Sequence, residues 1–155
     1  MSAPKSVVKL SKNGVEYTSS VDKCEYYIFE LSRRALMDVG RFVTRKFAES
    51  YYQIFKKHKG LARKAIRYKV YSNKNTQYPR VQIGLKNTKV GFYSMFQEFG
   101  SSKTPKYNLL TKAVEDNIQQ IVEIESQYLS ALEDEAKALS MIESEDDYEG
   151  GGDEE

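Results

Sequence analysis

The chain has 155 residues, of which 40% are hydrophobic and 30% charged, with one cysteine and no tryptophan. This length suits a single domain. A lone cysteine, Cys24, excludes an internal disulfide and fits synthesis in a reducing compartment. No apolar run approaches the roughly 18 residues of a membrane span, and the first ten residues lack the apolar core of a signal peptide. We therefore expect neither secretion nor membrane insertion.

The charges are divided unequally along the chain. Residues 1–112 contain 23 Lys and Arg against 7 Asp and Glu, a net charge of +16. Residues 113–155 contain 1 basic residue against 15 acidic ones, a net charge of −14. This division favours head-to-tail contact between copies, contact with a polyanion, or shielding of a basic body by its own acidic end.

The first predicted elements are a terminal arm and a long helix. Residues 1–18 predict an arm or a β-hairpin, since Asn13-Gly14 is a common two-residue hairpin turn. Apolar residues then recur at steps of three and four, which predicts a helix over about 20–58. Its apolar stripe comprises Tyr27, Ile28, Leu31, Ala35, Val39, Phe42, Val43, Phe47, Tyr51, Ile54 and Phe55. Gly40 lowers the helix propensity in the middle by about 1 kcal/mol relative to alanine.

The apolar period then changes from helical spacing to alternation. Residues 64–72 and 79–87 alternate apolar with polar side chains across a turn, which predicts two antiparallel strands. Residues 92–99 fit either a third strand or a short helix, and periodicity alone leaves both open. The predicted class is α+β, with a small antiparallel sheet packed against two long helices in one domain over 19–142.

A second long helix is predicted after Pro105, with Asn108 as its capping residue. Its predicted apolar stripe is Leu110, Ala113, Val114, Ile118, Ile121, Val122, Tyr128, Leu129, Leu132, Ala136 and Leu139. Residues 143–155 are acidic, rich in glycine and poor in apolar side chains, so we expect this tail to be disordered.

Residue types that carry catalysis are sparse. The one histidine, His58, lies among lysines at a predicted helix end, where a solvated cation favourable to the helix dipole is the simpler interpretation. The sequence has neither paired metal-ligand motifs nor a glycine-rich phosphate loop. We expect no enzyme activity, no metal and no cofactor.

A basic cluster surrounds the first predicted strand, with Lys64, Arg67 and Lys69 as candidates for a DNA-facing surface. A solvated charged face explains the same residues equally well. The sequence leaves these two interpretations open.

The segment Glu98-Phe99-Gly100-Ser101-Ser102-Lys103-Thr104-Pro105 predicts a rigid turn. Gly100 permits positive φ, the hydroxyl side chains satisfy turn amides, and Pro105 stiffens the exit. Such a loop between two packed elements presents a fixed surface to a neighbour. A structural turn is the alternative, and the expectation that these eight residues form an assembly contact rests on the family resemblance that follows.

This segment, followed at helical spacing by Leu109, Leu110 and Ala113, resembles a signature of the minor tail component, or tail-completion, family of lambda-like long-tailed bacteriophages. The specific part covers some 15 residues, and the order of elements is similar over about residues 20–130. The chain has Lys106-Tyr107-Asn108-Leu109 where the family usually has Ala-Arg-Pro-Phe.

The resemblance implies a structural protein of the virion neck, assembled in the bacterial cytoplasm, that completes the tail and joins it to the head. It implies a hexameric ring with the tail terminator or tail tube protein and the head connector or adaptor proteins as partners, and non-specific contact with DNA in the lumen. The alternative is a nucleic-acid-binding module with a basic face and a shielding acidic tail.

Overall fold

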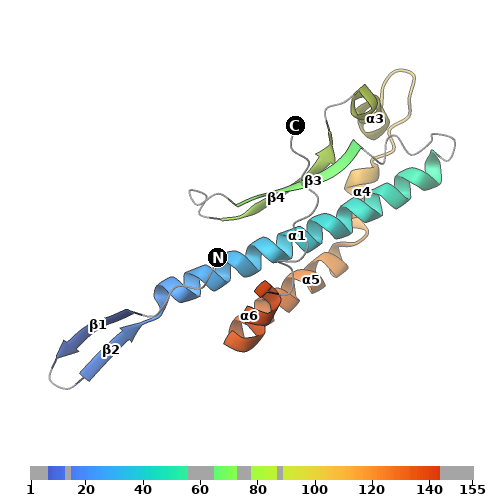
Figure 1. Cartoon of the computed structure of the whole chain (residues 1–155). Helices are drawn as coiled ribbons and strands as arrows, with labels where there is room; N and C mark the ends of the chain where they lie inside the picture. Colours follow the sequence, from blue (N-terminus) through green and yellow to red (C-terminus); the bar gives the residue numbers. More distant parts are fainter. Residues whose placement is uncertain (1–6, 13–14, 56–64, 73–77, 87–88, 144–155) are drawn as a thin grey trace.

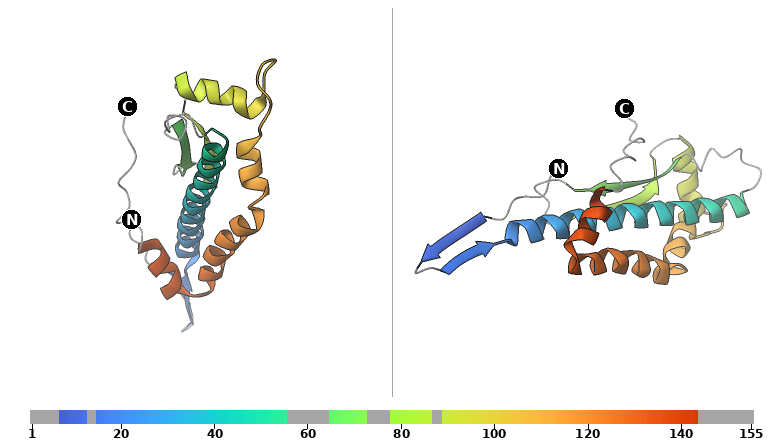
Figure 2. Two further views of the ribbon diagram at one scale, coloured as in Figure 1. Left: turned by 90° about the vertical axis from the view of Figure 1, so that its right-hand side faces the viewer. Right: turned by 60° about the horizontal axis from the view of Figure 1, so that its bottom comes forward.

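The computed structural model describes residues 7–12, 15–55, 65–72, 78–86 and 89–143 (Figure 1). The fold is α+β and mostly helical. Its axis is the long helix α1 (Val21–Ile54). A β-hairpin packs along one side of α1, and the C-terminal helices pack along another (Figures 1 and 2). In the part of the chain described here, none of the helices has both the length and the hydropathy to span a bilayer.

Helix α1 confirms the predicted long helix, and its apolar side chains recur every four residues. The buried ones are Tyr27, Leu31, Ala35, Val39, Val43, Phe47 and Tyr51. Each step of four advances about 40° around a helix with 3.6 residues per turn. The buried stripe therefore winds around α1 and presents its two halves to different neighbours. Ile28 and Ile54, which the pattern also placed on the stripe, are exposed.

The two strands predicted from alternation are confirmed as β3 (Ile66–Tyr71) and β4 (Arg80–Leu85). They pair antiparallel, with Ile66 opposite Leu85 and Tyr71 opposite Arg80. Gly40 lets this hairpin approach α1 closely, because a Cβ atom at position 40 would lie 2.6 Å from Cδ2 of Tyr68. Gly40 therefore lowers the helix propensity of α1, but its missing side chain leaves room for the sheet.

The N-terminal segment is a hairpin of β1 (Val7–Lys12) and β2 (Val15–Ser19), with a register irregularity between Val8 and Leu10. It extends beyond the N-terminal end of α1 (Figure 1). The predicted turn at residues 13–14 lies outside the described residues.

The predicted second long helix is not confirmed. The segment is divided into α4 (Leu109–Glu115), α5 (Ile118–Ser130), the 3-10 turn η1 (Ala131–Glu133) and α6 (Glu135–Glu143). Short polar side chains at the breaks compete for backbone partners.

At the first break, Asn117 Nδ2 donates to the carbonyl of Ala113 over 3.0 Å, and at the second, Asp134 Oδ1 accepts from the amide of Ala136 over 2.9 Å. The stripe that was predicted to be core is accordingly split. Its exposed members include Val114, Ile118, Val122, Leu129 and Leu132. Of the predicted acidic tail, Glu143 is the last residue of α6, and residues 144–155 lie outside the described residues.

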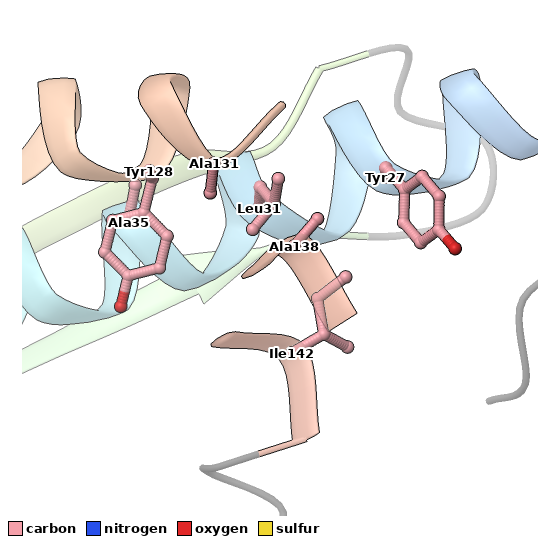
Figure 3. Close-up of a cluster of buried hydrophobic side chains, with 7 residues drawn as sticks. All are labelled: Tyr27, Leu31, Ala35, Tyr128, Ala131, Ala138 and Ile142. Atoms are coloured by element: carbon pink, nitrogen blue, oxygen red, sulfur yellow. The ribbon is translucent and has the colours of Figure 1, made fainter. Parts of the chain in front are cut away.

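Two apolar clusters hold the layers together. The first joins the N-terminal half of α1 to α5, η1 and α6, and it consists of Tyr27, Leu31, Ala35, Tyr128, Ala131, Ala138 and Ile142 (Figure 3). The second joins the C-terminal half of α1 to β3 and α4, and it consists of Phe47, Tyr51, Ile66, Leu109 and Ala113.

Polar contacts fasten the same layers. Buried Arg34 donates from Nη2 to the carbonyl oxygen of Ile142 over 2.7 Å, which places a cation at the C-terminal end of α6. Tyr128 donates to Asp38, whose carboxylate pairs with Arg41 over 3.3 Å. Arg41 Nε in turn donates to the hydroxyl oxygen of Tyr68 over 3.2 Å. This chain of contacts crosses α1 from α5 to the sheet.

Candidate functional site

The predicted turn lies between α3 (Lys89–Phe99) and α4. The segment 92–99, which periodicity left open, is therefore helical. Gly100 follows with φ of +80°, the left-handed conformation that glycine adopts without a Cβ penalty. Ser101 and Thr104 then bond each other's backbones over 2.9 and 3.3 Å and form a tight reversal.

The chain returns from this reversal to the end of α3. The amide of Tyr107 donates to the carbonyl of Gln97 over 3.0 Å, and that of Asn108 donates to the carbonyl of Glu98 over 3.3 Å. These bonds satisfy carbonyls that the last turn of a helix leaves free. The connection is therefore closed on itself by backbone bonds rather than by side chains alone.

Glu98 caps the helix that follows the loop. Its carboxylate is buried and accepts from the backbone amides of Leu109 at 2.7 Å, Leu110 at 2.9 Å and Thr111 at 3.4 Å. These are the first amides of α4, which have no partner within their own helix. A negative charge there also complements the helix dipole. Glu98 is thus bound within its own chain and fixes α4 relative to α3.

Asn108 occupies the N-cap position of α4 as predicted, but its side chain does not cap the helix. Asn108 has φ of 52° and ψ of 42°, in the left-handed region, and its side chain makes no capping bond. An N-cap side chain usually reaches the second or third amide from an extended backbone. The left-handed backbone instead turns the chain into α4, and the carboxylate ten residues earlier takes over the capping.

The inner side of α3 is polar because it meets the hydroxyl group of Tyr51. The hydroxyl donates to Gln97 Oε1 and lies 3.2 Å from Ser94 Oγ. Burial raises the pKa of Tyr51 above its ordinary value of 10.0. Among the α3 residues whose exposure is described, Gly91, Ser94 and Glu98 are buried. This side therefore serves the packing of α3 on α1 and α4.

The outer side of α3 is aromatic and exposed. Its large exposed side chains are Phe92, Tyr93, Met95, Phe96 and Phe99. The ring centroids of Phe92 and Phe96 lie 5.1 Å apart in an edge-to-face arrangement. Of these side chains, only Phe99 was predicted from the sequence to be a contact residue. The heptad spacing of Phe92, Phe96 and Phe99 was the signal that would have found the others.

The predicted contact loop thus separates into two groups. Ser101, Ser102, Lys103 and Pro105 are exposed at the tip, together with Phe99, whose side chain is 69% exposed. Glu98 is buried, and Gly100 and Thr104 are half-buried. The buried residues shape the loop, and the exposed ones are accessible to a partner.

The predicted basic surface lies on the outer face of β3–β4. Arg67 and Lys69 are exposed there, whereas Lys64 lies outside the described residues. Arg80 on β4 joins the surface, since its guanidinium carbon lies 5.5 Å from the ring centroid of Tyr71 and Lys69 Nζ lies 5.2 Å from the same centroid. The sequence analysis missed Arg80, which the pairing of Tyr71 with Arg80 places on this face.

Among the described residues, no group of three His, Cys, Asp or Glu side chains lies close enough to hold a metal ion. His58 lies outside the described residues. Comparisons of the chain with protein-family models, with curated proteins and with solved structures give no match. A function therefore has to be inferred from the geometry of the α3–α4 connection and of the basic face.

Proposed function

We propose that the protein is a structural component of a phage neck, where it completes the tail and joins it to the head connector as a ring. The observation that carries this proposal is that Glu98, Phe99 and Gly100 have three different structural roles. Glu98 caps α4, Gly100 makes the left-handed turn, and Phe99 between them points its ring into solvent. The signature that resembles the tail-completion family thus builds a rigid loop that displays an aromatic side chain.

Further support comes from the order of the elements. A long helix, a β-hairpin and the turn follow one another in the order that the resemblance implies, whereas short helices stand where it implies a long C-terminal helix. In this role α1 is the scaffold, the loop tip with Ser101, Ser102 and Lys103 contacts a neighbour, and the partners are the tail terminator or tail tube protein and the head connector or adaptor proteins. Tails of this kind have sixfold symmetry, which makes a hexamer the proposed assembly.

The test is complementation of a phage whose copy of this gene is deleted. Without the protein we expect filled heads and unattached tails by electron microscopy, and the wild-type chain restores joined particles. Phe99→Ser should restore few joined particles while its circular dichroism stays native. Tyr52→Ser is the matched control, because Tyr52 is an exposed aromatic residue on α1 and not part of the predicted contact loop. Normal joining in the deleted phage would exclude the neck role.

The second candidate function is nucleic-acid binding through the outer face of β3–β4. Arg67, Lys69 and Arg80 lie on one face with Tyr71 between them, which is a surface of the kind that contacts phosphates and stacks on bases. The triple change of these three basic residues to glutamine should abolish salt-dependent binding to DNA. Replacement of the exposed Lys103 by glutamine is the control, and it should leave DNA binding unchanged. Absence of any binding by the wild-type protein would exclude this candidate.

A further inference from the structure

Helix α3 has its hydrophobic pattern turned outward. Among the α3 residues whose exposure is described, the buried ones are small or polar, namely Gly91, Ser94 and Glu98. Its aromatic stripe, formed by Phe92, Phe96 and Phe99 at positions i, i+4 and i+7, faces solvent. A surface helix ordinarily shows the reverse arrangement. No other described segment covers this stripe, and a contiguous exposed apolar patch of this kind marks an interaction surface.

A second apolar face lies on α5. Ile118, Val122 and Leu129 share one side of this helix and are 58%, 57% and 63% exposed. Val114 at the end of α4 and Leu132 in η1 are exposed as well. Periodicity predicted these residues as core, and they are instead open to solvent within the described part of the chain. Among the described residues, neither of these two apolar surfaces has an internal cover.

The charges around these two faces are opposite. Residues 86–112, which contain α3 and its loop, have five lysines and one acidic residue, a net charge of +4, and that acidic residue is the buried Glu98. Residues 113–143, which contain α5 and α6, have eight acidic residues and one lysine, a net charge of −7. The aromatic face thus belongs to a basic segment and the aliphatic face to an acidic one, and the two segments are complementary in charge.

The two faces lie apart on the molecule, since α3 is near one end and α5 and α6 are toward the other (Figure 2). One copy therefore leaves both faces open. A twofold contact centred on one of the two faces would place α3 against α3 or α5 against α5 and bring like charges together, which disfavours such pairing. Contact of α3 in one copy with α5 in the next removes both apolar faces from water and pairs opposite charges.

We propose that the α3 stripe of one copy docks on the α5 face of a second copy of this chain. The contact joins two different surfaces, so it either closes reciprocally between two copies or repeats from copy to copy into a ring or an open chain. This inference deepens the proposed function. The closure of the contact into a ring rests on that function. The docking of α3 on α5 depends only on the surfaces described above.

Disulfide cross-linking of the purified full-length protein tests the contact. In a Cys24→Ser background, Phe99→Cys marks the α3 face and Val122→Cys marks the α5 face, and both positions are exposed in the single copy. We expect a mixture of the two single variants to form dimers on mild oxidation. Each single variant alone should remain monomeric on a non-reducing gel. A chain with both cysteines should form dimers if the contact closes reciprocally and a ladder of multimers if it repeats.

Three results would overturn the proposal. Efficient dimers of Phe99→Cys alone, or of Val122→Cys alone, would show a twofold contact centred on that face. Equal cross-linking of Phe99→Cys to an Arg67→Cys control on the outer sheet face would show random collision. Absence of any cross-link, together with monomers in sedimentation up to high concentration, would show that another protein or nothing covers the two faces.

Sedimentation gives a second measurement that does not need cysteines. The double change Phe92→Ser with Phe96→Ser should shift the protein to monomer with unchanged circular dichroism. Ile28→Ser on α1 is the matched control, because Ile28 is exposed and apolar but lies outside both faces. Equal loss of association in the control would contradict the assignment. Since these experiments use the isolated protein, a contact that is found while phage complementation fails leaves the contact intact and removes only the neck function.

Discussion

Helices α1 and α3 have opposite relations between pattern and burial. On α1 the apolar stripe faces inward and forms both apolar clusters, with Leu31, Val43 and Phe47 almost fully buried. On α3 the apolar stripe faces outward, and polar groups bind the helix to α1 and α4. An apolar stripe shows that a helix has a partner, but the partner of α1 lies in the same chain and that of α3, in our proposal, lies in another.

This difference separates the residues that fold the molecule from those that we expect to assemble it. Substitutions on the α1 stripe should change the free energy of unfolding. Substitutions on the α3 stripe should change association and leave unfolding nearly unaltered. The predictions below compare the two, beginning with the largest expected effect.

The same substitution should have unequal effects on the two stripes. Phe47 is 1% exposed, so Phe47→Ala removes a filled core position and should lower the free energy of unfolding by about 3–5 kcal/mol. Phe99→Ala, at a position 69% exposed, should change it by less than about 0.5 kcal/mol. Urea denaturation at low protein concentration measures both. Equal losses would mean that the α3 stripe is part of the monomer's core.

The cap from Glu98 should contribute the next largest effect. Glu98→Ala leaves the first amides of α4 without their acceptor in a buried site, and an unsatisfied buried donor costs about 1–3 kcal/mol. Glu98→Gln keeps one acceptor oxygen and should lose less. Denaturant unfolding ranks the three proteins. If Glu98→Ala unfolds at the wild-type denaturant concentration, the carboxylate does not hold α4.

The turn itself should be less costly to change than its cap. Gly100→Val places a branched side chain at φ of +80° and a Cβ atom about 3.1 Å from Cβ of Lys106, so we expect a loss of about 1–2 kcal/mol. Gly100→Asn is the control, because asparagine tolerates the left-handed region better than valine. Thermal unfolding distinguishes the two variants. A valine variant as stable as the asparagine variant would show that the turn relaxes at no cost.

The smallest effect concerns the pair that fastens α6 to the beginning of α1. The hydrogen bond from Lys23 lowers the pKa of Glu135 below its ordinary value of 4.5, and Glu135 raises that of Lys23 above 10.5. The pair therefore stabilises the folded protein at pH values between 4.5 and 10.5, the ordinary pKa values of the two groups. This stabilisation is lost as the pH falls through the lowered pKa of Glu135 or rises through the raised pKa of Lys23.

Glu135→Gln should remove this pair's contribution to stability and with it the losses at acid and at alkaline pH. The variant and the wild-type protein should therefore converge in stability at acid pH. Both side chains reach solvent, so the difference at neutral pH should be small. Unfolding at several pH values measures it. A difference that grows on acidification would contradict the assignment of the pair.

The sequence predicted local features well. The recurrence of apolar residues predicted the start of α1 to within a few residues. The alternation of apolar and polar residues predicted both strands of the β3–β4 hairpin. The residue type of Gly100 permits positive φ, and the residue adopts φ of +80°. Each of these features depends on neighbours within a few positions, which the sequence places side by side.

Other features depend on contacts between distant segments. The sequence by itself determined which residues share a side of a helix or strand, because the periods of the backbone are fixed. It did not determine which side meets protein, so the outward stripe of α3 and the exposed face of α5 emerged only with the fold. The cap on α4 likewise comes from Glu98, across a loop that backbone bonds must first close. Tertiary structure decided these points because burial and capping are set by whichever groups the folded chain brings together.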